Sequence, residues 1–339
     1  MTVESANDDV DFSSVSTTAP AQFSVTARGA FPSEEDAHRL ATVVGELVRV
    51  LSRKFDLSRL DGVTVAEDYA QALAELDRGY ESSHTLTPSE GAVVGVAMTP
   101  SVLRDDVLKC HIVFNARYLW PLKDTSDPTA LQLPLHIVAH ECAHVEVTGK
   151  FEAAIPGLLL RSRFTNLWER ARSDVIFACW DEYAVTLLCA GIGADPTESY
   201  EETLITNMGI VRQEANEAIK AYRLHSDLDQ VYREVYRTYA NLLKYASYYL
   251  GNLAGRDTEL SVRPNFEATL AGHWFEEYFH RLDNACKAIM AQYGMWQDLS
   301  LFEVVADIAD DMVAEGGIIM RREGGQLYID IPFTAETMP

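Results

Sequence analysis

The stretch that decides the fold is Leu133-Pro134-Leu135-His136-Ile137-Val138-Ala139-His140-Glu141-Cys142-Ala143-His144-Val145-Glu146-Val147. Its centre has the pattern HExxH. Residues four apart on a helix lie on the same face, so His140 and His144 can bind one metal ion from one side. Glu141 lies one residue further round, where a carboxylate can accept a proton from water on that metal. We expect the metal to be Zn²⁺, for which imidazole nitrogen is a common ligand.

The residues around the motif predict a buried helix. They are apolar on almost every face: Ile137, Val138, Ala139, Cys142, Ala143 and Val145. Burying two histidines and a glutamate without partners is costly, and a bound metal removes that cost. Pro134 is expected in the first turn of the helix, where its missing N–H would be unpaired in any case.

His136 extends the histidine series by one more turn, but helix geometry excludes it as a partner of His144. Eight residues of helix rise about 12 Å, whereas ligand bonds to zinc are near 2 Å. We therefore expect His136 to have a capping or packing role.

With these residues the chain resembles the zincin metallopeptidases. The metzincin branch has a glycine and a histidine three and six residues after the second ligand, where this sequence has Val147 and Lys150. The chain is more similar to the gluzincins, and that resemblance implies a third zinc ligand, a glutamate on a later helix. Within 177–188, Glu182 is the candidate. The thermolysin-like pattern has an aspartate four residues after this ligand, and here that position is Thr186.

Asp181 directly precedes Glu182, so the register of the third ligand has to be argued from the neighbours. Residues at helical spacing from Glu182 are almost all apolar, and a carboxylate buried among them needs a strong partner. The face around Asp181 includes Asp174 and is more polar, which favours Glu182 as the ligand. Asp181 then either lies nearer a polar edge or supports a ligand histidine. Glu152 and Glu169 are weaker rivals in more highly charged surroundings.

Composition limits the classes of partner. The 339 residues carry a net charge of −23, which disfavours nucleic acid because phosphates would be repelled. The sequence contains no run of 18 apolar residues, so it predicts no membrane span. The N-terminus shows no signal-peptide pattern. The five cysteines contain no CxxC pair, which is typical of a reducing compartment, so we expect a cytoplasmic location.

The pattern of helices and strands predicts an α+β, mainly α architecture. We expect a zincin-like fold with a small mixed sheet, the HExxH helix and a large helical C-terminal part. The expected divisions are a disordered tail over 1–22, a metal-binding domain over 23–192 and a helical part over 193–339 that ends in a β-hairpin. Expected helices cover 33–54, 68–76, 201–224, 228–250, 267–293 and 301–315, with strands near 63–65, 92–98 and 111–115. The last strand is either a core strand or the edge that pairs with an extended peptide.

The expected function is zinc-dependent hydrolysis of a peptide bond in a peptide or protein substrate. Glu141 would be the catalytic base, and His140, His144 and Glu182 the zinc ligands. Tyr183 is either a donor to the developing oxyanion or a buried structural tyrosine. The alternative is a regulatory or interaction protein that keeps a zinc site with little peptidase activity, since fold does not determine function. In that case the tyrosine-rich segment over 228–250 would form a surface that binds a partner and would not belong to the hydrophobic core.

Overall fold

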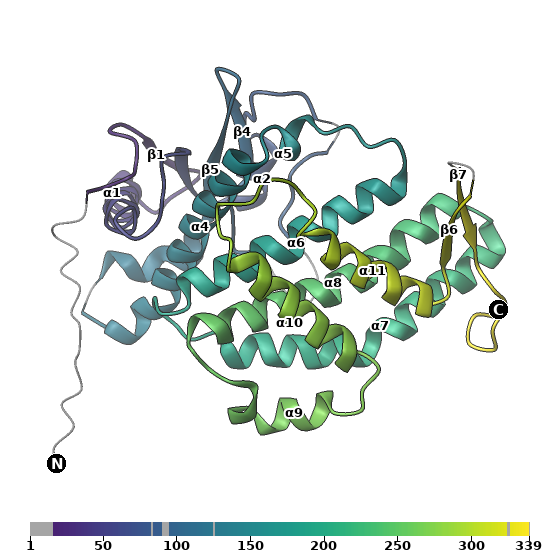
Figure 1. Cartoon of the computed structure of the whole chain (residues 1–339). Coiled ribbons are helices and arrows are strands. Elements are labelled where there is room, and N and C mark those ends of the chain that lie inside the picture. Colours follow the sequence, from purple (N-terminus) through teal and green to yellow (C-terminus); the bar gives the residue numbers. More distant parts are fainter. Residues whose placement is uncertain (1–15, 83, 90–94, 125, 324–325, 339) are drawn as a thin grey trace, which may run out of the picture. The chain divides into compact units, whose positions relative to one another are not determined.

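A computed structural model describes residues 16–82, 84–89, 95–124, 126–323 and 326–338 (Figure 1). The described residues form two compact units, one that ends at Gly149 and one that begins at Lys150. The described structure is mainly helical with a small mixed sheet, as the sequence predicted. The division at Gly149 differs from the expected boundary at 192, and it assigns the helix that carries Glu182 to the second unit.

The first unit carries the sheet. Its elements are β1 (Ser24–Arg28), α1 (Glu34–Leu51), β2 (Leu60–Ala66), α2 (Tyr69–Ala74), β3 (Ala97–Met98), β4 (Ser101–Arg104), β5 (Val107–Asn115), α3 (Ala116–Leu119), the 3-10 helix Trp120–Lys123 and most of α4 (Pro128–Ala154). The strand order is β1-β2-β5, with β3 and β4 both paired to the other side of β5. β1, β2 and β5 are parallel, and β3 and β4 run antiparallel to β5.

This topology makes the strand over 111–115 a core strand, because β5 is paired on both sides. The alternative, in which it forms a peptide-binding edge, is therefore wrong. The outer strands on that side are β3 and β4. Only Ala97–Met98 of the strand expected over 92–98 is found, and 90–94 lie outside the described residues.

The sheet has helices on both faces. α1 approaches the face that carries Val25, since a Cβ built at Gly45 would lie 3.1 Å from that side chain. α2 covers the opposite face, where Tyr69 packs with Ala66 and Val113. Ser33 caps α1 by accepting a hydrogen bond from the N–H of Asp36, and both α1 and α2 lie within the helices predicted over 33–54 and 68–76.

The predicted N-terminal tail is too long. The Thr18 hydroxyl donates to the carbonyl oxygen of Phe55 at 2.6 Å and accepts from the N–H of Leu57 at 2.9 Å. Ala19 is buried. These residues are thus held against the segment that follows α1 by hydrogen bonds between positions 37 and 39 residues apart in sequence, which a reading of local composition does not reveal. Residues 1–15 of the expected tail lie outside the described residues.

The HExxH helix, α4, is longer than predicted and begins before Pro134. Asp127 accepts hydrogen bonds from the N–H groups of Thr129 and Ala130, which caps the helix at Pro128. Pro134 therefore lies inside the helix and not in its first turn. The expected burial is confirmed: Val138, Ala139, Cys142, Ala143 and Val145 are all fully buried.

The second unit is a helical array followed by a hairpin. Its elements are α5 (Leu158–Arg161), α6 (Leu167–Cys189), α7 (Thr197–His225), α8 (Leu228–Gly255), the 3-10 helix Leu260–Val262, α9 (Pro264–Leu270), α10 (Glu276–Met290), α11 (Glu303–Glu315), β6 (Ile319–Glu323) and β7 (Gln326–Asp330). α8 packs against α6, α7, α10 and α11 (Figure 1). The helix expected over 267–293 is divided between α9 and α10, with Gly272 in the left-handed region at φ 72° between them.

Two glycines let α6 and α8 approach closely. A Cβ at Gly251 would lie 2.2 Å from the carbonyl oxygen of Tyr183, and one at Gly255 would lie 2.3 Å from that of Leu187. These distances are too short for any side chain, so the spacing of the two helices depends on glycine at both positions.

The tyrosines of α8 belong mainly to the core. Tyr232, Tyr236, Tyr239 and Tyr249 are buried. Tyr236 donates to Asp310 at 3.1 Å, and Tyr249 donates to Glu201 at 2.8 Å. The predicted C-terminal hairpin is confirmed by antiparallel pairing of Ile319 with Asp330, and its Gly324-Gly325 turn lies outside the described residues.

Candidate metal centre

His140 and His144 project their rings toward each other from consecutive turns of α4. Their Nε2 atoms lie 3.1 Å apart, and their ring centroids are 4.8 Å apart at an interplanar angle of 79°. Both residues are partly exposed, whereas the helix around them is buried. Two nitrogens bound to one tetrahedral zinc at 2.0–2.1 Å would be about 3.3 Å apart. The histidine pair therefore fits a shared metal ion.

Glu141 completes the cluster. One ligand atom from each of His140, Glu141 and His144 lies within 4.8 Å of the others. Glu141 is buried, at 6% exposure. This group could hold a metal ion, and its carboxylate is near enough to act on a molecule that the ion binds.

The Glu141 carboxylate has a partner that the sequence did not identify. The Thr99 hydroxyl donates to Glu141 Oε2 at 2.7 Å and lies 3.2 Å from the carbonyl oxygen of the same residue. Thr99 comes directly after β3 and is 42 residues away in sequence. No local sequence pattern joins the two residues, because they come together only in the folded chain.

Two other residues of the first unit define the surroundings of Glu141. Cys142 is fully buried, and burial raises the pKa of its thiol. Tyr69 is 5% exposed, and burial and then the charge of Glu141 raise the pKa of its hydroxyl. The tyrosine and the carboxylate thus share a region of low polarity.

His136 lies one turn before the pair. Its ring centroid is 6.1 Å from that of His140. Among the described residues, the cluster with His144 includes His140 and Glu141 and does not include His136. This agrees with the expectation that His136 and His144 do not share an ion.

Glu182 lies on α6 of the second unit, whereas the two histidines and Glu141 belong to the first. It is 8% exposed, among the buried residues Cys179, Val185 and Thr186. Its Oε1 lies 3.6 Å from Nζ of Lys244 on α8. Asp181 is more exposed than Glu182, in line with the expected difference between the two faces. The ligand role of Glu182 stays a prediction.

The two rival glutamates have local structural roles. Glu169 accepts hydrogen bonds from the N–H and the hydroxyl of Thr165 just before α6. Glu152 accepts from the N–H of Gly157 at 3.0 Å. Both carboxylates therefore bind the backbone near turns.

Tyr183 belongs to the core of the second unit. It is 1% exposed and stacks on Trp180 with ring centroids 6.2 Å apart. Burial raises the pKa of its hydroxyl, and the nearby Cys286 and Asp283 raise it further. These contacts favour a structural role for this tyrosine over a role in oxyanion binding.

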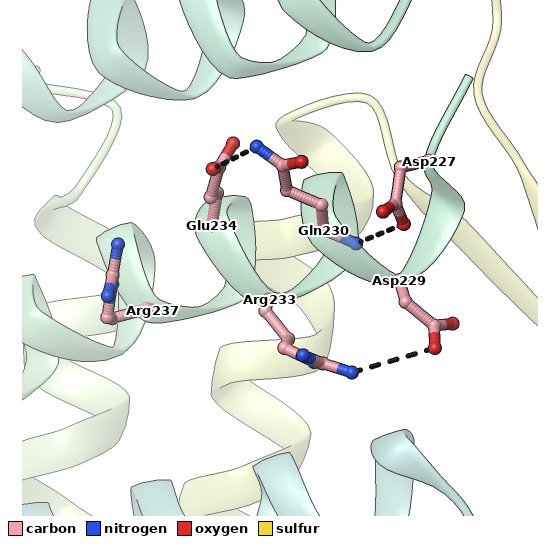
Figure 2. Close-up of a pocket in the computed structure, with 6 residues that line it drawn as sticks. All are labelled: Asp227, Asp229, Gln230, Arg233, Glu234 and Arg237. Atoms are coloured by element: carbon pink, nitrogen blue, oxygen red, sulfur yellow. Dashed lines mark hydrogen bonds and ion pairs between the residues drawn. The ribbon is translucent and has the colours of Figure 1, made fainter. Parts of the chain in front are cut away.

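A separate surface pocket of about 480 Å³ lies at the start of α8 (Figure 2). Its lining is charged or polar: Asp227, Asp229, Gln230, Arg233, Glu234 and Arg237. Most of these side chains make local contacts along the helix, such as Asp229 with Arg233 at 3.6 Å and Gln230 with Glu234 at 2.9 Å. Asp227 caps the helix by accepting from the N–H of Gln230. The pocket is thus a solvated helix end and contains no arrangement typical of catalysis.

Comparisons with protein-family models, curated proteins and solved structures find no match to this chain. No helix in the described residues is long and apolar enough to span a membrane. All five cysteines are buried, and none of them forms a disulfide.

Proposed function

We propose that this chain is a zinc-dependent peptidase with a gluzincin-like centre. The observation that carries the proposal is the 3.1 Å separation of the His140 and His144 Nε2 atoms, with the Glu141 carboxylate in the same cluster. Two imidazoles and an adjacent buried carboxylate supply two ligands and a base, which a zinc centre that activates water can use.

His140 and His144 would hold the zinc ion, with Glu182 as the proposed third ligand. When bound, zinc supplies a Lewis acid that lowers the pKa of water and polarises a carbonyl group. Glu141 accepts a proton from the attacking water and later delivers it to the nitrogen of the leaving amine. The substrate class that fits this chemistry is a peptide or protein.

The buried cysteines, none of which forms a disulfide, support a reducing compartment for this activity, and we propose the cytoplasm. Burial keeps each thiol from reacting, and no disulfide holds the described structure together.

The test compares zinc-loaded wild type with Glu141→Gln on a mixed peptide library. Glutamine keeps the size of glutamate but removes the base, so metal content should persist while hydrolysis falls by about 10²- to 10⁴-fold. Glu146→Gln is the matched control: it lies on the same helix and accepts a hydrogen bond from the N–H of Asp56, which an amide oxygen can also do.

Hydrolysis by the wild type should stop on chelation and return with added zinc. A zinc-loaded wild type that cleaves no peptide would overturn the proposal and favour a regulatory protein with a zinc site. Full activity in Glu141→Gln would show that another group is the base.

A further inference from the structure

Thr99 is held by backbone hydrogen bonds on both sides. The residues before it pair with β5, through Ala97 with Phe114 and Met98 with Val113. After it, the carbonyl oxygen of Pro100 accepts a hydrogen bond from the N–H of His111 at 3.0 Å. The sheet therefore fixes the position of the Thr99 backbone, and with it the position of the Thr99 hydroxyl.

The contact of this hydroxyl with Glu141 is short and has an anionic acceptor. At 2.7 Å, an O–H donor to a carboxylate falls in the range of charge-assisted hydrogen bonds, which are about twice as strong as neutral ones. The terminal torsion of a glutamate is otherwise broad, so a fixed donor at Oε2 selects one orientation of the carboxylate.

The surroundings strengthen this hydrogen bond. Glu141 and Tyr69 are both at least nine-tenths buried, and Tyr69 packs in a cluster with Ala66, Val113 and Met98 of β3. Among the described residues, the Tyr69 hydroxyl has no hydrogen-bond partner, so it does not compete with Thr99 for the carboxylate. A hydrogen bond is stronger where the local dielectric constant is low.

We propose that Thr99 is a positioning residue for Glu141, which orients the carboxylate toward the His140–His144 pair. This inference rests on the proposed function, since it assigns Glu141 the part of the base. Thr99 itself touches neither metal nor substrate in this assignment. It acts by holding Oε2, so the reactive orientation of the base exists before substrate binds.

The experiment compares Thr99→Val, which keeps the shape but loses the hydroxyl, with Thr99→Ser, which keeps the hydroxyl. Thr42→Val is the matched control, because the Thr42 hydroxyl donates only to the carbonyl oxygen of His38 on the exposed side of α1. Zinc content, kcat and KM on a peptide substrate are measured for each. Thr99→Val should keep its zinc and its KM while kcat falls about tenfold, and Thr99→Ser should restore kcat.

A second readout needs no turnover. The protein is loaded with Co²⁺, and its affinity for acetohydroxamate is measured from the absorption spectrum, with azide as a probe that needs no carboxylate. Acetohydroxamate loses a proton when it chelates a metal, so its binding depends on a carboxylate placed to accept that proton. Affinity should fall about tenfold in Thr99→Val and recover in Thr99→Ser, while azide binding stays constant.

Each outcome decides a different point. Unchanged kcat and hydroxamate affinity in Thr99→Val overturn the positioning role, and so does a Thr99→Ser variant as impaired as Thr99→Val, which would indicate packing alone. If Glu141→Gln binds acetohydroxamate as tightly as the wild type does, the positioning role of Thr99 is also overturned. Hydroxamate binding that depends on Thr99 in a protein that cleaves no peptide supports the positioning role and rejects the peptidase. A wild type that binds no metal overturns both.

Discussion

Lys244 Nζ lies 3.6 Å from Glu182 Oε1, so the carboxylate proposed as the third zinc ligand has a cationic neighbour within its own unit. The Glu182 side chain is 10% exposed and that of Lys244 is 31% exposed. A partly buried pair of this kind offsets the cost of placing the carboxylate among apolar residues. It also places a positive charge beside a group that would bind a dication, and the two cations repel each other.

The first prediction concerns this pair. Lys244→Met should lower the free energy of unfolding without metal, because Glu182 loses its cation. If Glu182 is a ligand, zinc should then raise the melting temperature of the variant more than that of the wild type, since the repulsion is gone. Differential scanning calorimetry with and without zinc measures both effects.

Alanine at each acid separates Glu182 from its neighbour. Glu182→Ala should weaken zinc binding by more than the roughly 10- to 100-fold that loss of an outer partner costs, and Asp181→Ala by less than that. Zinc affinity that is unchanged in Glu182→Ala would remove it from the ligand set.

The second prediction is that His140 and His144 together bind about one zinc ion per chain, because imidazole nitrogen is a common zinc ligand and the two Nε2 atoms lie 3.1 Å apart. Replacing either by alanine should abolish tight binding and the stabilisation that zinc provides, which is about 2.7 kcal/mol at a hundredfold excess over Kd. His136→Ala, one turn away on the same helix, should keep both. Metal analysis and thermal melting provide the measurements, and zinc loss in His136→Ala would show that the ion is bound one turn earlier.

The third prediction tests the close approach of α6 and α8. Gly251→Ala would place a Cβ 2.2 Å from a backbone carbonyl oxygen, so the helices must separate, at a cost of at least about 1–3 kcal/mol. Gly209→Ala on α7 is the control: its Cβ would meet nothing within 4 Å, and it should stabilise the helix by about 0.5–1 kcal/mol. Urea denaturation measures both, and equal effects at the two positions would contradict the packing argument.

The fourth prediction concerns His111, whose Nδ1 lies 3.0 Å from Asp61 Oδ2 and whose Nε2 lies 2.9 Å from Thr64 Oγ1. Burial lowers its pKa below the ordinary 6.5, although Asp61 acts in the opposite direction. Below pH 6.5 the unfolded chain therefore binds a proton more readily than the folded chain, so the free energy of unfolding falls as the pH drops.

The His111 contribution is obtained as a difference between variants. His111→Gln should make the dependence of unfolding free energy on pH shallower below pH 6.5, by at most about 1.4 kcal/mol per pH unit. Parallel curves for His111→Gln and the wild type would show that His111 has the same proton affinity in both states.

The sequence alone determined those features that depend on neighbours along the chain. The four-residue spacing of His140 and His144 places both rings on one side of a helix wherever that helix lies, because the helical period requires it. The apolar residues around them predicted the burial of that helix for the same reason. The caps at Ser33 and Asp68 are local features of the same kind, since each cap and its target are three residues apart.

Tertiary structure alone decided the features that join distant segments. The chain contains many threonines, and only the pairing of β3 with β5 selects Thr99 as the partner of Glu141. Lys244 reaches Glu182 because α8 packs on α6, and that packing depends on Gly251. The prediction that Pro134 lies in the first turn was wrong, because Asp127 and Pro128 start the helix earlier. A proline at either position can begin a helix, and the sequence alone does not choose between Pro128 and Pro134. These contacts depend on which surfaces pack together in the folded chain, and the residues next to each contact in the sequence do not show which surfaces those are.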